Sequence, residues 1–406
     1  MGLGKTIQAL AIAKYYDSDW PLLVICPAGL LHDWREAIGL FLDASSTIVR
    51  DSVDFGDKIS IISNVMATKY SDMITADNYK VIIVDECHGL KSTKTQRTKA
   101  LLPILQKSTR LIMCSGTPAV SRPVELYPII QALHKGPFTS YNEYGMRYCN
   151  GRLVNGRYDF QGCSNADELS YFMEKEFMIR RRKEAVLSKL PKKNRKKIEL
   201  SLENVELTEG MVDNKTVIGN DVALAYRKAC EVKVDPVLAY INSLVEKETK
   251  FLVFAHHKTM IDAIAENIKS MNIKYMKIDG NVPVAKRKML VDAFQKDDSY
   301  KVAVLSLTAA STGLTLTAAS LVVFAELFWN PGVLMQAEDR AHRIGQTKPV
   351  EVLYLVCEKT IDEIVWPYLL RKLSVLEKIG LSKNELKQIK GQTTGQKAID
   401  EYFNMK

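Results

Sequence analysis

The 406-residue chain has a net charge of +9, and 47% of its residues are hydrophobic and 25% are charged. This length is too great for one ordinary core and fits two domains, while the composition is ordinary for a soluble globular protein. No apolar run approaches the roughly 18–20 residues that span a bilayer, and the seven scattered cysteines form no Cys-x-x-Cys pair, so neither a membrane protein nor a zinc or disulfide framework is indicated.

The first half of the chain alternates short β-branched runs with helical patterns. Three nearly continuous apolar runs are typical of buried strands: residues 21–27, 81–85 and 110–114. Strands of this kind, separated by helices, indicate a parallel sheet that is covered on both faces.

The second half repeats this scheme, with helical patterns at 258–271 and 283–296 between further apolar runs. The expected strands are residues 250–255, 274–278, 302–306, 321–325 and 350–355. The sequence therefore predicts an α/β protein with two doubly wound, parallel-sheet lobes.

The segment between the lobes is rich in Lys, Arg, Asn and Tyr, and we expect it to form a basic helical connector. After about residue 381 the composition turns polar, which is typical of a flexible tail. The expected domains are residues 1–135 for the first lobe, 136–235 for the connector, 236–380 for the second lobe and 381–406 for the tail.

A glycine motif, Gly2-Leu3-Gly4-Lys5-Thr6, opens the chain just before a helical pattern. Glycines let backbone N–H groups approach phosphate oxygens, and the helix N-terminus adds positive potential. We expect Lys5 to contact the β- and γ-phosphates of ATP and Thr6 to ligate Mg²⁺. No strand precedes this motif, so we expect the first sheet to lack its middle strand, either because the protein begins upstream or because the gene model is truncated.

An acidic pair, Asp85-Glu86, lies at the carboxyl end of the strand predicted at 81–85. Ligands bind at this end of the strands in open α/β sheets. We expect Asp85 to hold Mg²⁺ through water and Glu86 to polarise the attacking water. Taken alone, the pair could equally be a solvated strand end.

Two arginines, Arg340 and Arg343, stand three residues apart in a run with helical character, which predicts that both project from one face. Such a pair at a phosphate site neutralises the charge that develops during phosphoryl transfer. With the glycine motif and the acidic pair in the expected order, the arginines predict a nucleotide motor in which Glu86, Arg340 and Arg343 are catalytic.

Hydroxyl groups follow two further strands. Ser115 and Thr117 could link the nucleotide state to the lobe position, although an ordinary turn with Gly and Pro explains this motif at least as well. Thr308 could hold a phosphate of ATP or of a nucleic-acid backbone. Trp329 could stack on a sugar or base, or pack at an interface.

Two basic clusters lie in the expected connector, at residues 180–183 and 192–197. They could follow the phosphates of DNA, although charge runs are usually solvated faces. The net charge of +9 also suits a polyanionic partner such as nucleic acid.

The motifs at residues 2–6, 85–88, 115–118 and 336–346 resemble, in this order, those of the Swi–Snf-type ATPases, a branch of the superfamily-two helicases. The resemblance covers nearly all of residues 1–380. Several further sequence segments are similar to those of the annealing helicases, which are DNA translocases that remodel replication forks. The segments of this finer match are residues 148–149, 158–162, 164–169, 250–257 and 322–332.

The resemblance implies two RecA-like lobes, ATP hydrolysis with Mg²⁺ in the cleft between them, and translocation on double-stranded or forked DNA. It places Gly2 and Gly4 in the nucleotide-binding loop and Gly313 and Gln336 in nucleotide-coupling motifs. It also implies a monomeric nuclear motor that acts in fork remodelling and DNA repair.

Two other functions stay open at this point. A chromatin-remodelling ATPase would need histone-reading modules, and none is visible in the sequence. A non-catalytic protein that binds DNA and a sliding clamp would result if the short glycine motif cannot bind ATP.

The tail fits the pattern Q-x-x-[ILM]-x-x-[FY]-[FY] at Gln396, Ile399, Tyr402 and Phe403, which resembles the peptide that binds the replication sliding clamp. One helical turn would place the three apolar side chains on one side, as a plug for an apolar pocket, with Gln396 beside them. Two exposed aromatic residues in a polar tail call for a partner. The alternative is a terminal helix that docks on the second lobe.

Overall fold

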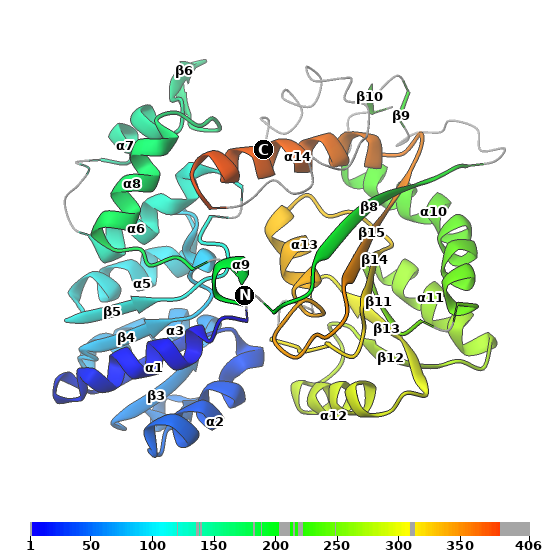
Figure 1. Cartoon of the computed structure of the whole chain (residues 1–406). Coiled ribbons are helices and arrows are strands. Elements are labelled where there is room, and N and C mark those ends of the chain that lie inside the picture. Colours follow the sequence, from blue (N-terminus) through cyan, green and yellow to red (C-terminus); the bar gives the residue numbers. More distant parts are fainter. Residues whose placement is uncertain are drawn as a thin grey trace. The chain divides into compact units, whose positions relative to one another are not determined.

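The computed structural model describes residues 2–119, 121–134, 138, 140–181, 183–187, 189–202, 212–213, 216–217, 222–247, 249–308 and 313–381. The chain forms two compact units. Unit 1 comprises Met1–Arg182 with Ser374–Lys383, and unit 2 comprises Lys183–Leu373 with Asn384–Lys406. Each unit contains a parallel sheet, so the expected α/β class with two parallel-sheet lobes is confirmed (Figure 1).

The sheet of unit 1 has five parallel strands in the order β2-β3-β1-β4-β5. Their bounds are β1 Leu22–Cys26, β2 Thr47–Val49, β3 Ile59–Ser63, β4 Val81–Val84 and β5 Arg110–Met113. The strands predicted at 21–27, 81–85 and 110–114 are therefore confirmed as β1, β4 and β5. The described sheet has no gap in its middle, contrary to our expectation, because β4 bonds directly to β1 on one side and to β5 on the other.

Helices cover both faces of this sheet, because alternate strand residues enter two separate cores. Leu22 and Val24 pack with α1 (Lys5–Tyr15) and α2 (Leu31–Leu42). Leu23 and Ile25 pack on the opposite side with four helices. These are α3 Asn64–Lys69, α4 Ser71–Ala76, α5 Gln96–Lys107 and α6 Tyr127–Leu133.

A third core of unit 1 lies outside this sheet. It joins α7 (Tyr141–Tyr148) and α8 (Ala166–Glu176) to residues Leu376, Ile379 and Leu381. Between the two helices the chain forms an antiparallel hairpin of β6 (Arg152–Val154) and β7 (Arg157–Asp159).

Unit 2 has a six-stranded parallel sheet in the order β12-β13-β11-β14-β15-β8. The strands are β8 Lys193–Leu200, β11 Phe251–Ala255, β12 Lys274–Ile278, β13 Tyr300–Ser306, β14 Leu321–Phe324 and β15 Val350–Cys357. All five strands predicted for the second lobe are confirmed, and β8 is an addition. A separate two-stranded sheet pairs β9 (Val212–Asp213) with β10 (Thr216–Val217).

Both faces of the larger sheet are covered here as well. Phe251 and Val253 of β11 pack with α10 (Val222–Val245) and α11 (Lys258–Ser270). Leu252 and Phe254 face the core on the other side. The helices contributing to that core include α12 Val284–Lys296, α13 Pro331–Glu338 and α14 Asp362–Lys378.

The expected connector, residues 136–235, is divided between the units and is only partly helical. Its residues from 183 onward belong to unit 2, where α9 (Lys183–Val186) and β8 precede α10. Strand β8 forms because the polar run at 193–200 pairs along its full length with β15. Among the described residues, no helix is both long and apolar enough to cross a membrane.

Candidate functional site

The N-terminus of α1 has the geometry of an anion site. Gly2 and Gly4 have left-handed φ angles of 75° and 72°, and Gly4 caps the helix without a side-chain hydrogen bond. A Cβ atom at Gly4 would meet no atom within 4 Å, so the space beside it is open. The first backbone N–H groups of α1, together with Lys5 and Thr6, can therefore receive a phosphate.

Asp85 follows β4 and is buried, with 7% of its surface exposed. Trp34 Nε1 donates to its Oδ2 at 3.0 Å, and the Glu86 amide donates to Oδ1 at 2.9 Å. Burial and the charge of Glu86 raise the pKa of the carboxyl, whereas Lys5 lowers it. The charge of Lys5 thus acts on Asp85, and Trp34 is a hydrogen-bond partner that the sequence analysis did not name.

The residues at this site fit Mg²⁺. Burial disfavours the charged form of a carboxyl group, and a nearby cation favours that form again. Oxygen atoms, such as those of carboxylates and hydroxyls, are the ligands that Mg²⁺ prefers. Asp85 and the half-buried Thr6 supply these oxygens at the end of β4 and the start of α1. We therefore propose Mg²⁺ at this site from the chemistry of the Asp85 and Thr6 side chains.

Glu86 has a left-handed backbone with φ 48° and ψ 50°, a conformation that is uncommon for a residue with a side chain. Its Oε2 lies 3.2 Å from His88 Nδ1, which in turn lies 3.3 Å from Ser115 Oγ. Ser115 Oγ also accepts the amide N–H of Thr117 at 3.1 Å. A polar chain thus joins the acidic pair to the loop after β5, through a histidine to which the sequence analysis gave no role.

The two arginines lie beyond the helix, contrary to the predicted helical run. Helix α13 ends at Glu338, and turns follow because the N–H groups of Ala341 and His342 both bond back to the Glu338 carbonyl. The arginines still reach one loop. Arg340 Nη1 lies 3.5 Å from the Leu314 carbonyl oxygen, and Arg343 Nη1 lies 3.3 Å from that of Gly313.

Gln346 fixes the end of this turn segment. Its Nε2 lies within 3.1 Å of the carbonyl oxygens of Thr317, Ala319 and Ala341, and its Oε1 accepts the amides of the two following residues. One amide side chain thus ties the arginine segment to the loop that the arginines contact. Sequence reasoning included Gln346 in the motif but gave it no role.

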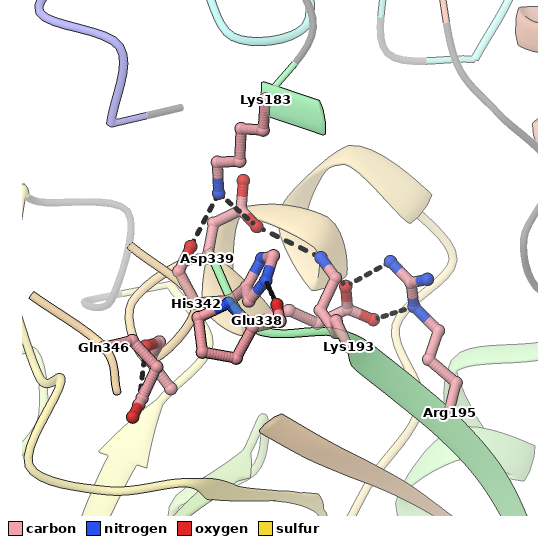
Figure 2. Close-up of polar contacts among 9 residues, drawn as sticks. Lys183, Lys193, Arg195, Glu338, Asp339, His342 and Gln346 are labelled. Atoms are coloured by element: carbon pink, nitrogen blue, oxygen red, sulfur yellow. Dashed lines mark hydrogen bonds and ion pairs between the residues drawn. The ribbon is translucent and has the colours of Figure 1, made fainter. Parts of the chain in front are cut away.

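A buried ion cluster lies directly before the arginines and is drawn in Figure 2. It contains Lys183, Lys193, Arg195, Glu338 and Asp339. Arg195 bonds Glu338 at two points, Lys193 lies 2.8 Å from Glu338, and Lys183 lies 2.9 Å from Asp339. Within the basic cluster at 192–197, Lys193 and Arg195 of strand β8 therefore point inward to these acids, which neither reading of the sequence included. Lys192 and Lys196 are exposed, and their contact with DNA stays a prediction.

The electrostatics of the ion cluster are set by mutual compensation. Burial alone would raise the pKa of Glu338, but Arg195 and Lys193 bring it down to about 2. Burial likewise opposes ionisation of Asp339, but Lys193 and Lys183 hold its pKa below the ordinary value. Next to them, His342 Nε2 lies 2.7 Å from the Pro191 carbonyl oxygen, and burial lowers the pKa of the imidazole.

The remaining predicted residues of unit 2 are placed as follows. Trp329 is 39% exposed and stacks on Phe328, with ring centroids 4.6 Å apart, so it packs against protein while part of it stays accessible. Thr308 Oγ1 lies 2.9 Å from Ser306 Oγ after β13. Gly313 has φ 45°, and Gln336 is buried within α13.

Glu326, after β14, is a further buried acid that the sequence analysis did not single out. Its Oε2 accepts the amides of His256 and His257, and its Oε1 lies 2.6 Å from His257 Nδ1. Cys230 brings a third donor group within 4.8 Å of this pair. Because hydrogen bonds already occupy both carboxylate oxygens, we assign the group to ordering the ends of β11 and β14.

Two family profiles match the chain: the SNF2-related domain over residues 1–209 and the helicase conserved C-terminal domain over residues 233–345. The chain belongs to the SNF2-related family. The two matches fall largely on unit 1 and unit 2 respectively, and together they include the glycine motif, the acidic pair and both arginines.

Individual proteins are also similar in sequence to this SNF2-related chain. The SWI/SNF-related matrix-associated actin-dependent regulator of chromatin subfamily A-like protein 1 of Xenopus laevis is 44% identical over 94% of this chain. The DNA annealing helicase and endonuclease ZRANB3 of Homo sapiens is 38% identical over 92% of it. This chain spans only 42% and 38% of the length of these two relatives.

Proposed function

We propose that this SNF2-related chain is the ATP-hydrolysing motor of a DNA translocase that acts as an annealing helicase in replication-fork remodelling and DNA repair. The observation that carries the proposal is the pairing of an open, glycine-led helix N-terminus with the buried Asp85, whose pKa is raised by burial and whose carboxylate lies within the electrostatic influence of Lys5. A helix start without a side-chain cap, a lysine in its first turn and a buried acid on which this lysine's charge acts together suit a nucleoside triphosphate and its metal.

The site residues of unit 1 then have separate roles in ATP hydrolysis. The amides of α1 and Lys5 bind the β- and γ-phosphates, while Thr6 and Asp85 hold Mg²⁺, whose charge offsets that of the phosphates. Glu86 orients the attacking water and accepts its proton. The strained backbone of Glu86 and its contact with His88 fix the direction of the carboxylate.

Arg340 and Arg343 supply positive charge to the phosphoryl group during its transfer. Their contacts with the carbonyls of Leu314 and Gly313 support this role, because a guanidinium that is already oriented loses less entropy on binding. Arg340 is 5% exposed, so little water competes for its charge. Gln336 and Gly313 lie in the same region of unit 2 and would couple nucleotide binding to these arginines.

The proposed partner is double-stranded or forked DNA, and the proposed location is the nucleus, with the motor acting as a monomer. The relative ZRANB3 is described as a DNA annealing helicase. Ser115 and Thr117 support coupling, since the polar chain from Glu86 through His88 reaches them. Thr308 and Trp329 are proposed DNA-coupling residues of unit 2.

The experiment compares ATP hydrolysis by the purified protein with no DNA, single-stranded DNA, linear duplex, forked duplex and nucleosomes. We expect strong stimulation by duplex, more by forks, and rewinding of a partly melted duplex that requires ATP. Stimulation by nucleosomes well beyond that of their free DNA would favour a chromatin remodeller instead. ATP hydrolysis that does not exceed the background rate with any nucleic acid would support a non-catalytic binding protein.

We also propose that Gln396, Ile399, Tyr402 and Phe403 bind the sliding clamp; these residues lie outside the described part of the chain. Aromatic anchors at such interfaces carry about 2 kcal/mol or more each. Calorimetry with a peptide of residues 391–406 should detect binding to the clamp, and Tyr402→Ala with Phe403→Ala should abolish it in the whole protein without changing ATP hydrolysis. No heat at high micromolar peptide would favour docking of the tail on unit 2.

A further inference from the structure

The hairpin β6–β7 of unit 1 is separate from the five-stranded sheet of that unit. Its strands are joined by Asn155 and Gly156, whose φ angles of 48° and 73° are both positive. A two-residue turn of this type matches the twist of the flanking strands and makes a tight hairpin. In Figure 1 the hairpin projects from the end of α7, away from the five-stranded sheet of its unit.

The tip of this hairpin exposes apolar side chains to water. Leu153 and Tyr158 are cross-strand partners and are 65% and 52% exposed, and the next residue, Val154, is 44% exposed. A cross-strand pair of this kind normally stabilises a hairpin by packing on a core. Here Leu153 and Tyr158 keep more than half of their surface exposed although Tyr158 stacks on Phe160, so their outer face is available to a partner.

The base of the hairpin is fixed to its unit. Phe160, which follows β7, is buried, and its ring lies so close to Gly145 that a Cβ there would be 2.5 Å from it. Gly151 also lies against this ring, because a Cβ added there would be 2.8 Å from Phe160. The ring of Tyr158 stacks on that of Phe160 at 5.7 Å. Side chains at the tip are thus presented by a rigid base, although two short strands alone would be marginally stable.

Positive charge flanks the apolar tip. Arg157 is exposed, and the side chain of Arg152 is 67% exposed, with Asp159 at 3.5 Å. An exposed pair at this distance leaves most of the arginine charge available. A tip that combines one aromatic ring, two aliphatic side chains and two arginines fits unpaired bases next to phosphates, because bases stack on aromatic rings and apolar side chains wedge between base steps.

We propose that the β6–β7 hairpin is a wedge that contacts the bases at a DNA junction, where duplex meets single strand. The proposal rests on the function proposed above, since it names the part of the DNA substrate that unit 1 recognises. Tyr158 stacks on the first unpaired base, Leu153 and Val154 close off the last pair, and Arg152 and Arg157 contact the adjoining phosphates. The charge of the tip favours DNA over an apolar protein partner.

The experiment uses a forked duplex with 2-aminopurine at the junction, whose fluorescence rises when the base unstacks. It is measured with the whole protein in the absence of ATP. The double variant Leu153→Ala with Tyr158→Ala should lose most of the fluorescence change and bind forks about tenfold more weakly, the scale of one lost base stack. Tyr158→Phe keeps the ring and should behave as the unaltered protein.

Tyr171→Ala is the matched control, because Tyr171 is a 65% exposed aromatic residue on α8 of the same unit. The hairpin variant should bind linear duplex within about twofold of the unaltered protein, the difference expected for a surface change that removes no phosphate contact. Unchanged fork binding and fluorescence in the double variant would overturn the proposal and point to a protein partner. Equal weakening on forks and linear duplex would also overturn it.

Failure of the proposed function gives a different pattern. If the unaltered protein does not hydrolyse ATP with any DNA, the motor assignment is wrong, but the fluorescence measurement still decides whether the hairpin contacts a junction. Conversely, DNA-stimulated hydrolysis with no effect of the hairpin variant on forks leaves the motor and removes the wedge.

Discussion

Arg195 on strand β8 and Glu338 at the end of helix α13 form a two-point ion pair, with Nε to Oε1 at 2.7 Å and Nη2 to Oε2 at 2.6 Å. Glu338 is fully buried, and the side chain of Arg195 is 7% exposed. Since Arg340 lies two residues beyond Glu338, the pair sets where the arginine segment begins (Figure 2). The edge strand of unit 2 therefore positions the residues that we assign to phosphoryl transfer.

The first prediction concerns this ion pair. Arg195→Met should destabilise unit 2 by about 3–5 kcal/mol, because it leaves the buried Glu338 carboxylate without its main partner. The midpoint of urea unfolding measures the loss. Lys196→Met is the control, since Lys196 lies on the same strand with a 58% exposed side chain and should cost less than about 1 kcal/mol. Equal effects of the two changes would contradict a structural role of the ion pair.

The second prediction concerns pH. The pKa of Glu338 is about 2 in the folded protein, below its ordinary value of 4.5, so ionisation of this group favours folding. The stabilisation is complete above the unfolded value and is lost as pH falls from about 4.5 toward 2. The difference in unfolding midpoint between the unaltered protein and Glu338→Gln should thus be constant from pH 7 to 5 and smaller at pH 3. A difference that grows on acidification would have the wrong sign.

Much of the fold was predictable because the buried parallel strands are apolar runs. The runs at 81–84, 251–255 and 321–324 are recognisable without context, since few other structures bury four or five consecutive apolar residues. Strand β8 was missed because half of its eight residues are Lys or Arg. Its signal is a period of two, with Lys193 and Arg195 inward and Lys192 and Lys196 outward, which becomes visible only when the buried acids are known.

The sequence predicted the helix start and the strand end where the candidate site residues lie, but not the local structure around the arginines. Gly4, Asp85 and Glu86 lie at the predicted helix start and strand end. The helical run through Arg340 was wrong, because the turns after Glu338 depend on contacts with residues far away in sequence, such as the carbonyls bonded by Gln346. His88 and Trp34 act through neighbours that only the tertiary structure provides.

The third prediction separates binding from chemistry. Arg343→Ala should lower turnover by about 10³-fold while the affinity for nucleotide changes little, because the guanidinium acts on charge that develops in the transition state. Single-turnover hydrolysis together with nucleotide titration gives both values. Arg227→Ala, an exposed arginine on α10, is the control. Weaker binding with normal turnover of the bound fraction would make Arg343 a ground-state ligand.

The fourth prediction concerns how DNA is bound. Contacts to the backbone release counterions, so the affinity for duplex should fall steeply with salt, with a log–log slope of about −0.9 per phosphate neutralised. The net charge of +9 motivates this expectation. Fluorescence anisotropy with duplexes of unrelated sequence between low and high salt is the measurement. A flat salt response, or a strong preference for one base sequence, would argue against backbone recognition.

The most direct test of the account is DNA-stimulated phosphate release by Lys5→Ala, compared with Lys14→Ala on the same helix. Lys14 is a suitable control because its side chain is 55% exposed and contacts the neighbouring Asp17 and the ring of Trp20. Loss of Lys5 should remove several kcal/mol, on the order of 3, of transition-state stabilisation, so phosphate release should fall to background while Lys14→Ala stays active. Full DNA-stimulated activity of Lys5→Ala would contradict the assignment of an ATP site to the start of α1.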